Sequence, residues 1–391
     1  MWQALGIIVL AHIVAPFIRE SVLELPALII IALLVAWVTW KNLHLGMLIA
    51  FTELFVGGHG HLLDVEILGF SLSLRIMIFL VLMAVWGLHI LSKRAKPVFH
   101  HMRDLPWLLL GVAVLLGTII GFMNNDAAQA FDDMNGFLMI LYLFPMISIK
   151  WTPQKKQELL QILAASVLWL TGITLLLAFL FTHLGGNALH EVYTFVRDAR
   201  LAEITLQTVS DSSGTVVNTR AAAILGEDGY WYRIFMQSQF YLIVGYTLLL
   251  SAIMHLWREQ RLKIEIIIAT SFIFSAILAS MSRSFILALI PATLLVAMLA
   301  IRAGKKPLRN IMKRSVSLIV AAAIGLVLLI GIIVVPPRGN LSGAAFYDTS
   351  ADSGRELAIS SRWQLLGPMM KEIAAAPVLG SGFGKEVSFV T

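Results

Sequence analysis

Long apolar runs recur along this chain, and they constrain its fold more than any other feature. Apolar residues make up 59% of the sequence and charged residues 13%, against roughly 45–50% and 25% in soluble domains. A run of roughly 17–25 apolar residues crosses a hydrocarbon layer about 30 Å thick as a single helix. Within lipid, a helix satisfies its backbone polar groups internally. The sequence therefore predicts an all-α, polytopic bundle of membrane helices.

About eleven spans are predicted, with boundaries good to roughly 2–4 residues. Two longer polar segments accompany them, and we divide the chain into helices over 1–182, an external loop over 183–233, further helices over 234–335 and a second external segment over 336–391. Within the loop, the pattern predicts an amphipathic helix over 190–203 and then a small hairpin with its turn at 211–214. The predicted spans are 2–18, 22–40, 43–57, 68–91, 106–122, 136–150, 158–182, 234–256, 264–280, 285–302 and 316–335.

Basic residues indicate how the helices are oriented. One set of connections holds Lys93, Lys150 and Lys306, whereas the opposite connections at 57–66 and 124–135 hold no Lys or Arg. An excess of Lys and Arg marks cytoplasmic loops. We therefore expect the N-terminus in the cytoplasm and both long polar segments on the outer side of a bacterial cytoplasmic membrane.

The remaining polar residues exclude several functions. The net charge of +6 follows from the basic loops and requires no nucleic-acid partner. The chain has no cysteine, which excludes disulfides and thiolate metal sites. We predict no metal and no cofactor, because His59 and His61 are more typical of a polar loop than of a metal site. Asp132 and Asp133 are likewise interpreted as solvating a loop.

Arg283 is the most informative single residue. It lies in a five-residue gap, 280–284, between two strongly apolar runs, so its guanidinium is expected at the bilayer boundary. A charge within hydrocarbon costs on the order of a few kcal/mol, which favours a functional role. The planar fork of donors suits phosphate oxygens. We predict that Arg283 binds a lipid-linked phosphate; the alternative is an anchor that reaches lipid headgroups.

Two other arginines are candidates for the same phosphate. Arg233 follows three aromatic residues at the entry to a span, where an interfacial anchor is the alternative. Arg75 lies about two turns into its predicted span. From there it can reach a phosphate or pair with Glu53 or Glu66.

The C-terminal third carries a family resemblance. The tripeptide Ser-Arg-Ser at 282–284 opens a span, and a basic loop and one more span follow. Then come Ser-Arg-Trp at 361–363, an amphipathic helix over 360–375, and Pro-Val-Leu-Gly-Ser-Gly-Phe-Gly at 377–384, expected to be a flexible turn. This order, over about 264–384, resembles the shared domain of bacterial O-antigen ligases and Wzy-type O-antigen polymerases.

That resemblance implies transfer of a glycan from an undecaprenyl pyrophosphate-linked donor to a glycan, lipid or protein acceptor. Arg283 and Arg362, with Arg233 and Arg75, would bind the pyrophosphate, and an external histidine would be the general base. No histidine follows His255, so the catalytic base is not assigned. The chain is accordingly expected to be an inactive fragment.

Two other classes of protein remain open. One is a secondary transporter or a lipid-linked oligosaccharide flippase, although the span pattern has no internal repeat of the kind that transporters often show. The other is a membrane protein without a catalytic role, which leaves the order of outer-face arginines unexplained.

Overall fold

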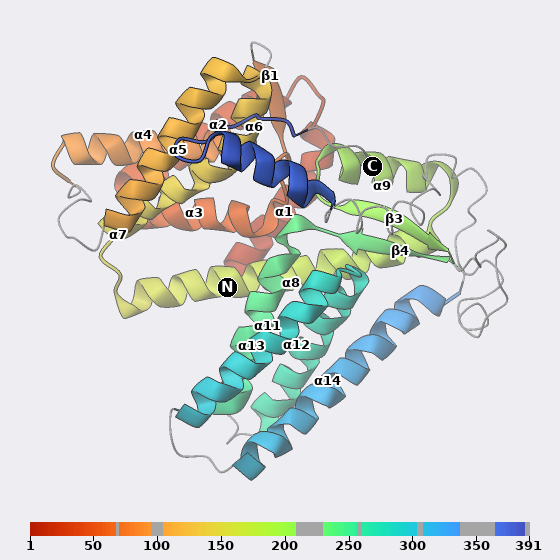
Figure 1. Ribbon diagram of the computed structural model, residues 1–391. Coiled ribbons are helices and arrows are strands. Elements are labelled where there is room, and N and C mark those ends of the chain that lie inside the picture. Colours follow the sequence, from red (N-terminus) through yellow and green to blue (C-terminus); the bar gives the residue numbers. More distant parts are fainter. Residues whose placement is uncertain are drawn as a thin grey trace. The chain divides into compact units, whose positions relative to one another are not determined.

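The computed structural model describes residues 1–67, 70–94, 105–208, 230–255, 260–302, 308–336 and 364–387. These parts of the chain are mainly helical (Figure 1), which confirms the all-α class. The predicted number of eleven spans stays a prediction. Among the described residues, five segments are long and apolar enough to cross a membrane: α2 (Glu24–Lys41), α4 (Leu74–Leu91), α5 (Leu105–Asn124), the segment Ala127–Ser148 and α8 (Pro153–His183).

Two compact units make up the chain, and each is built from separated stretches of sequence. The first comprises Met1–Ala32, Leu48–Met77 and Thr152–Asp348. The second comprises Leu33–Met47, Ile78–Trp151 and Thr349–Thr391.

Helix α8 is a central element of the first unit. It begins where Thr152 caps the first turn by accepting from the Lys155 amide, with Pro153 at a position where no backbone donor is needed. Its buried residues Val167 and Leu170 share one apolar core with α11 (Phe240–His255), α12 (Gln260–Ala279) and α13 (Arg283–Arg302). Helix α1 (Trp2–Ile18) also packs on α8.

A glycine brings α12 and α14 (Leu308–Val334) unusually close together. A Cβ atom at Gly325 would lie 2.7 Å from the backbone oxygen of Ser271. The Ser275 hydroxyl donates to the Gly325 carbonyl at 2.7 Å. A small residue and a hydrogen bond between helices are typical of helix packing within lipid.

The polar segment after α8 folds much as its sequence predicts. Helix α9 (Gly186–Asp198) forms slightly earlier than the expected 190–203, and β3 (Glu203–Thr208) follows it. Strand β3 pairs antiparallel with β4 (Tyr230–Phe235), with Thr205 opposite Arg233. The turn expected at 211–214 lies outside the described residues. A second hairpin joins β1 (Asp64–Ile67) to β2 (Phe70–Ser73).

The second unit corrects two expectations. The stretch 124–135 is not a bare loop, because α6 (Ala127–Leu138) begins there, capped by the Asp126 carboxylate. Asp133 does not merely solvate a loop, since it accepts from the Gly384 amide at 2.9 Å. Helix α6 continues into η2 (Met139–Tyr142) and α7 (Leu143–Ser148). The sequence pattern missed α6 because it carries adjacent carboxylates and few large apolar residues.

Candidate functional site

A cavity of about 390 Å³ lies in the first unit. Its walls come from the loop that follows α3 (Leu43–Val56), from α9 and from the β3–β4 hairpin. Three chemical types converge on it: an imidazole, two guanidinium groups and a carboxylate. The lining includes His59, Tyr193, Arg197, Arg200, Glu203 and Phe235.

Two glycines shape the loop that presents His59 to this cavity. Gly58 and Gly60 have φ angles of 57° and 88°, a left-handed conformation that residues with a Cβ rarely adopt. The Gly58 amide donates to the Ser238 hydroxyl at 3.0 Å. The Arg75 guanidinium donates to the Gly58 carbonyl at 2.8 Å. These two hydrogen bonds fix the backbone next to His59. The imidazole itself has no polar partner among the described residues.

The charge state of His59 follows from its surroundings. Burial, followed by the positive charges of Arg75 and Arg200, lowers the pKa of His59 below its usual value of 6.5, and Glu203 opposes this shift. The imidazole is consequently neutral at pH 7, and it can accept a proton.

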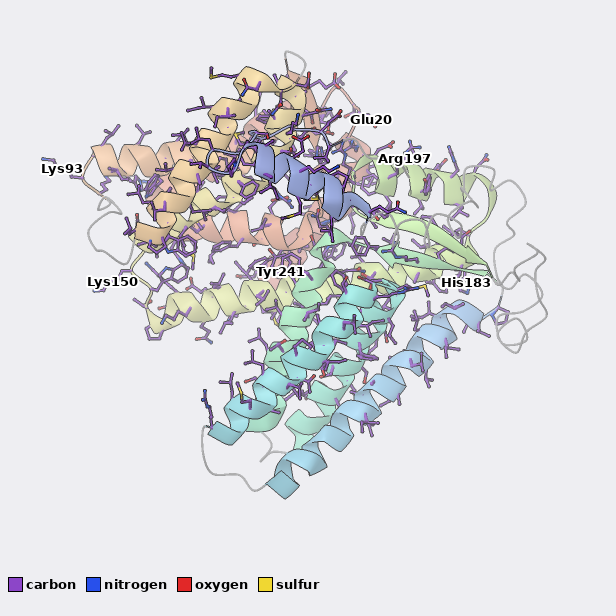
Figure 2. All side chains as sticks on the ribbon, in the orientation of Figure 1. Glu20, Lys93, Lys150, His183, Arg197 and Tyr241 are labelled. Carbon is purple, nitrogen blue, oxygen red and sulfur yellow. The ribbon has the colours of Figure 1, made fainter. Side chains whose placement is uncertain are left out.

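Arg200 is held in an unusual backbone conformation at the end of α9. Its φ angle is 46°, although this position after a helix normally favours glycine. The Leu201 amide donates to the Val196 carbonyl at 3.0 Å, which closes the end of the helix. Strain of this kind at a non-glycine residue often accompanies a functional side chain. Here it places a guanidinium on the cavity wall. Figure 2 labels Arg197 near the same helix end.

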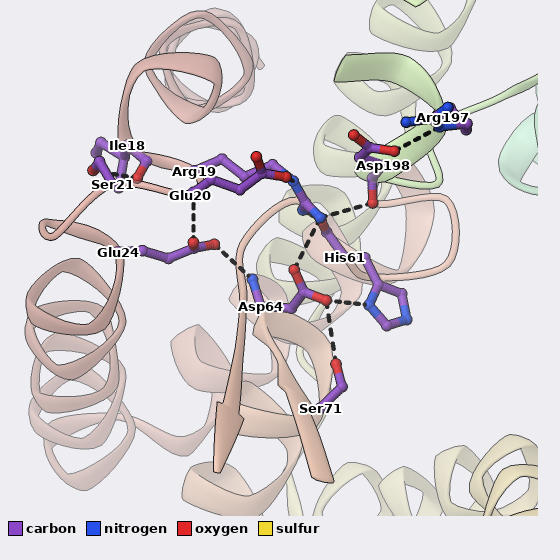
Figure 3. A network of polar contacts seen from close by, with 10 residues as sticks. All are labelled: Ile18, Arg19, Glu20, Ser21, Glu24, His61, Asp64, Ser71, Arg197 and Asp198. Carbon is purple, nitrogen blue, oxygen red and sulfur yellow. Dashed lines mark hydrogen bonds and ion pairs between the residues drawn. The ribbon is translucent and has the colours of Figure 1, made fainter. Parts of the chain in front are cut away.

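An ionic network stands next to the cavity (Figure 3). Arg19 pairs with Asp64 at 3.0 Å and donates to the Asp198 carbonyl at 2.8 Å. The opposite oxygen of Asp64 lies 3.1 Å from Nδ1 of His61. Arg200 approaches Nε2 of that imidazole at 3.4 Å. The network thus ties the His59 loop to the end of α9.

Arg233 contacts the short turn over residues 280–284, in which Arg283 lies. Arg233 donates from Nε to the Ser280 carbonyl at 2.9 Å, and its guanidinium lies 4.8 Å from the Phe235 ring centre. Phe235 lines the cavity and stacks on Phe285 at 5.7 Å. Arg283 begins α13 with an exposed side chain that makes no hydrogen bond or ion pair to a described residue.

The remaining predicted arginines are Arg75 and Arg362. Arg75 pairs with Glu53, with 2.9 Å between Nε and Oε2, as in the alternative drawn from the sequence. Arg75 supports the His59 loop by its hydrogen bond to the Gly58 carbonyl, and it is not one of the residues that line the cavity. Arg362 lies outside the described residues. The role of all four arginines in pyrophosphate binding stays a prediction.

Sequence reasoning missed Arg197, Arg200 and Glu203 as site residues. Their one available signal was the charged end of an amphipathic helix just before a hairpin. His183 lies at the end of α8 (Figure 2), and its Nε2 contacts the Val335 carbonyl at 2.7 Å. His61 is engaged with Asp64, whereas His59 lines the cavity.

Comparison with protein families, with curated proteins and with solved structures finds no match for this chain.

Proposed function

We propose that this protein transfers a glycan from an undecaprenyl pyrophosphate-linked donor to an acceptor hydroxyl at the outer face of the bacterial cytoplasmic membrane. The observation that carries the proposal is the cavity in which Arg197, Arg200 and the neutral His59 meet within a unit of apolar helices. The order of motifs over 264–384 supports the same class of enzyme.

The guanidinium groups supply the electrostatic part of this reaction. As the bond from the anomeric carbon to the pyrophosphate oxygen breaks, negative charge develops on the leaving group. Positioned donors that face such charge stabilise the transition state. Arg197 and Arg200 line the cavity. Arg283 begins α13 two residues before Phe285, whose ring stacks on the cavity residue Phe235.

We assign the proton acceptor to His59, and this proposal replaces the expectation from the sequence that the chain is inactive. The acceptor oxygen forms its bond to the anomeric carbon and gives its proton to the imidazole. The electron pair of the broken bond leaves with undecaprenyl pyrophosphate. General base catalysis of this kind contributes roughly 10²–10⁴-fold to the rate. The braced loop suits His59 to this role, and so does the absence of a competing polar partner within the described part of the chain.

Purified protein in detergent tests the two roles separately. Arg200→Gln should weaken binding of the undecaprenyl pyrophosphate-linked donor. His59→Gln should leave donor binding near the wild-type level and reduce transfer by about 10²–10⁴-fold. Arg283→Lys should retain more transfer than Arg283→Ala, because the ammonium keeps the charge but loses the fork.

Lys93→Gln is the matched control. It also removes one positive charge, but Lys93 is exposed and is not one of the residues that line the cavity. If the Arg200→Gln variant bound the donor as tightly as the wild-type protein, the pyrophosphate would not bind in this cavity. A folded protein that binds no donor would favour the transporter or flippase alternative.

A further inference from the structure

The helix over residues 364–375 has one apolar face that no other described part of the chain covers. Leu366, Met369, Met370 and Ile373 are 48%, 41%, 62% and 56% exposed. At 100° per residue, these four positions lie within an arc of about 100° on the helix. Lys371 lies on the opposite side. The helix is thus amphipathic, and its apolar side needs an occupant.

The turn after this helix is bound firmly to α5, which corrects the expectation that it is flexible. The Phe383 amide donates to the Gly117 carbonyl at 3.0 Å. Asn125 donates from its side-chain amide to the Ser381 and Phe383 carbonyls at 3.0 Å and 2.8 Å. Gly380, Gly382 and Gly384 have φ angles of 70°, 81° and 75°, which suit glycine.

Two glycines on α5, Gly117 and Gly121, leave the space that this turn occupies. A Cβ atom at Gly121 would lie 2.6 Å from the Phe383 oxygen, and one at Gly117 would lie 3.2 Å from the Phe383 ring. The pair Lys385–Glu372, at 3.8 Å, links the end of the turn back to the helix. Helix, turn and α5 therefore form one connected structure.

The exposed surface of helix α5 indicates the environment of this connected structure. It is long and apolar enough to cross a membrane. Its exposed side chains are apolar along nearly its whole length, and lipid hydrocarbon removes such a surface from water. Gly121 and Gly117 lie three and seven residues before its end at Asn124, which is about 5 Å and 10 Å along the axis. The exposed residues are Leu105, Trp107, Leu108, Leu109, Val112, Leu115, Leu116, Ile119, Phe122 and Met123.

We infer that the segment 364–387 lies within the membrane surface, with the apolar face of its helix among lipid acyl chains. Docking of Phe383 within the last two turns of α5 fixes the depth of the turn at the boundary between headgroups and hydrocarbon. Val378 and Leu379, in the turn after the helix, are also apolar and are 89% and 64% exposed. Amphipathic helices occupy this boundary with their apolar side buried about 5–10 Å. This inference does not depend on the proposed transfer reaction.

Single cysteines test the inference directly, because the chain has none. Met370→Cys and its neighbour Lys371→Cys can each carry an environment-sensitive fluorophore in protein reconstituted into phosphatidylcholine–phosphatidylglycerol nanodiscs. We expect lipid-attached spin labels to quench the probe at 370 several-fold more than the probe at 371. Aqueous iodide should show the opposite preference. Quenching of both positions by iodide alone would overturn the inference, and so would shielding of position 370 from both quenchers, which would indicate a protein occupant.

Two glycine variants test whether the docked turn sets the depth. Gly121→Ala places a methyl group against the Phe383 backbone, whereas Gly111→Ala, in the same helix, meets no atom within 4 Å. We expect Gly121→Ala to lower lipid quenching at position 370 and Gly111→Ala to leave it unchanged. Equal quenching in both variants would show that docking does not fix the segment.

Discussion

The ion pair between Glu53 and Arg75 offers the sharpest test of the site's construction. Its two side chains are only 9% and 16% exposed, and 2.9 Å separates Nε from Oε2. Arg75 also holds the His59 loop through the Gly58 carbonyl. Glu53→Gln keeps the shape of the side chain but leaves the guanidinium with no opposite charge. Removing one partner of a buried pair costs about 3–5 kcal/mol.

A double-mutant cycle separates the pair from the loss of each side chain. Glu53→Gln and Arg75→Met should each lower the free energy of unfolding by about 3–5 kcal/mol. The double variant should cost clearly less than the sum, because neither charge is then left unpaired. The free energies come from unfolding in mixed detergent micelles with increasing dodecyl sulfate, followed by circular dichroism.

Glu66→Gln is the matched control, since Glu66 is the other carboxylate within sequence reach of Arg75 and its side chain is exposed. That change should cost less than about 0.5 kcal/mol, as for other surface substitutions. A cost below 1 kcal/mol for Glu53→Gln, or an equal cost for Glu66→Gln, would refute the argument. Arg75 would then be free to serve as a direct phosphate ligand.

Two further predictions concern the pH dependence and the topology. Transfer should fall as the pH drops through the pKa of His59, which lies below 6.5. Arg200→Gln removes one cause of that lowering, so the acid limb of the rate profile should move to higher pH, and an unmoved limb would exclude His59 as the base. Ser284→Cys should react with a membrane-impermeant thiol reagent in intact cells while Lys93→Cys should not, because basic loops stay inside. The inverse pattern would place Arg283 in the cytoplasm.

Much of the site's local structure could be predicted because it depends on neighbours in the chain. The apolar side of α9 repeats at helical spacing, and the alternation from Ile204 predicts β3. Arg75 could not be assigned in this way. Its sequence allowed a phosphate, Glu53 or Glu66 as partner, and the choice depends on how the loop at Gly57–Gly60 folds back over it. The cavity was also missed, because its walls come from residues near 59, 200 and 235.

The sequence alone determined that the protein is built from apolar helices, since a low content of charge and repeated long apolar runs leave few other folds. It also indicated which face of the helix at 364–375 is apolar. The tertiary structure decided which polar groups meet. Asn125 and Phe383 stand 258 positions apart, and Arg19 and Asp198 stand 179 apart. No local pattern encodes such pairs, because each depends on the packing of several helices and on backbone turns that only glycine adopts without strain.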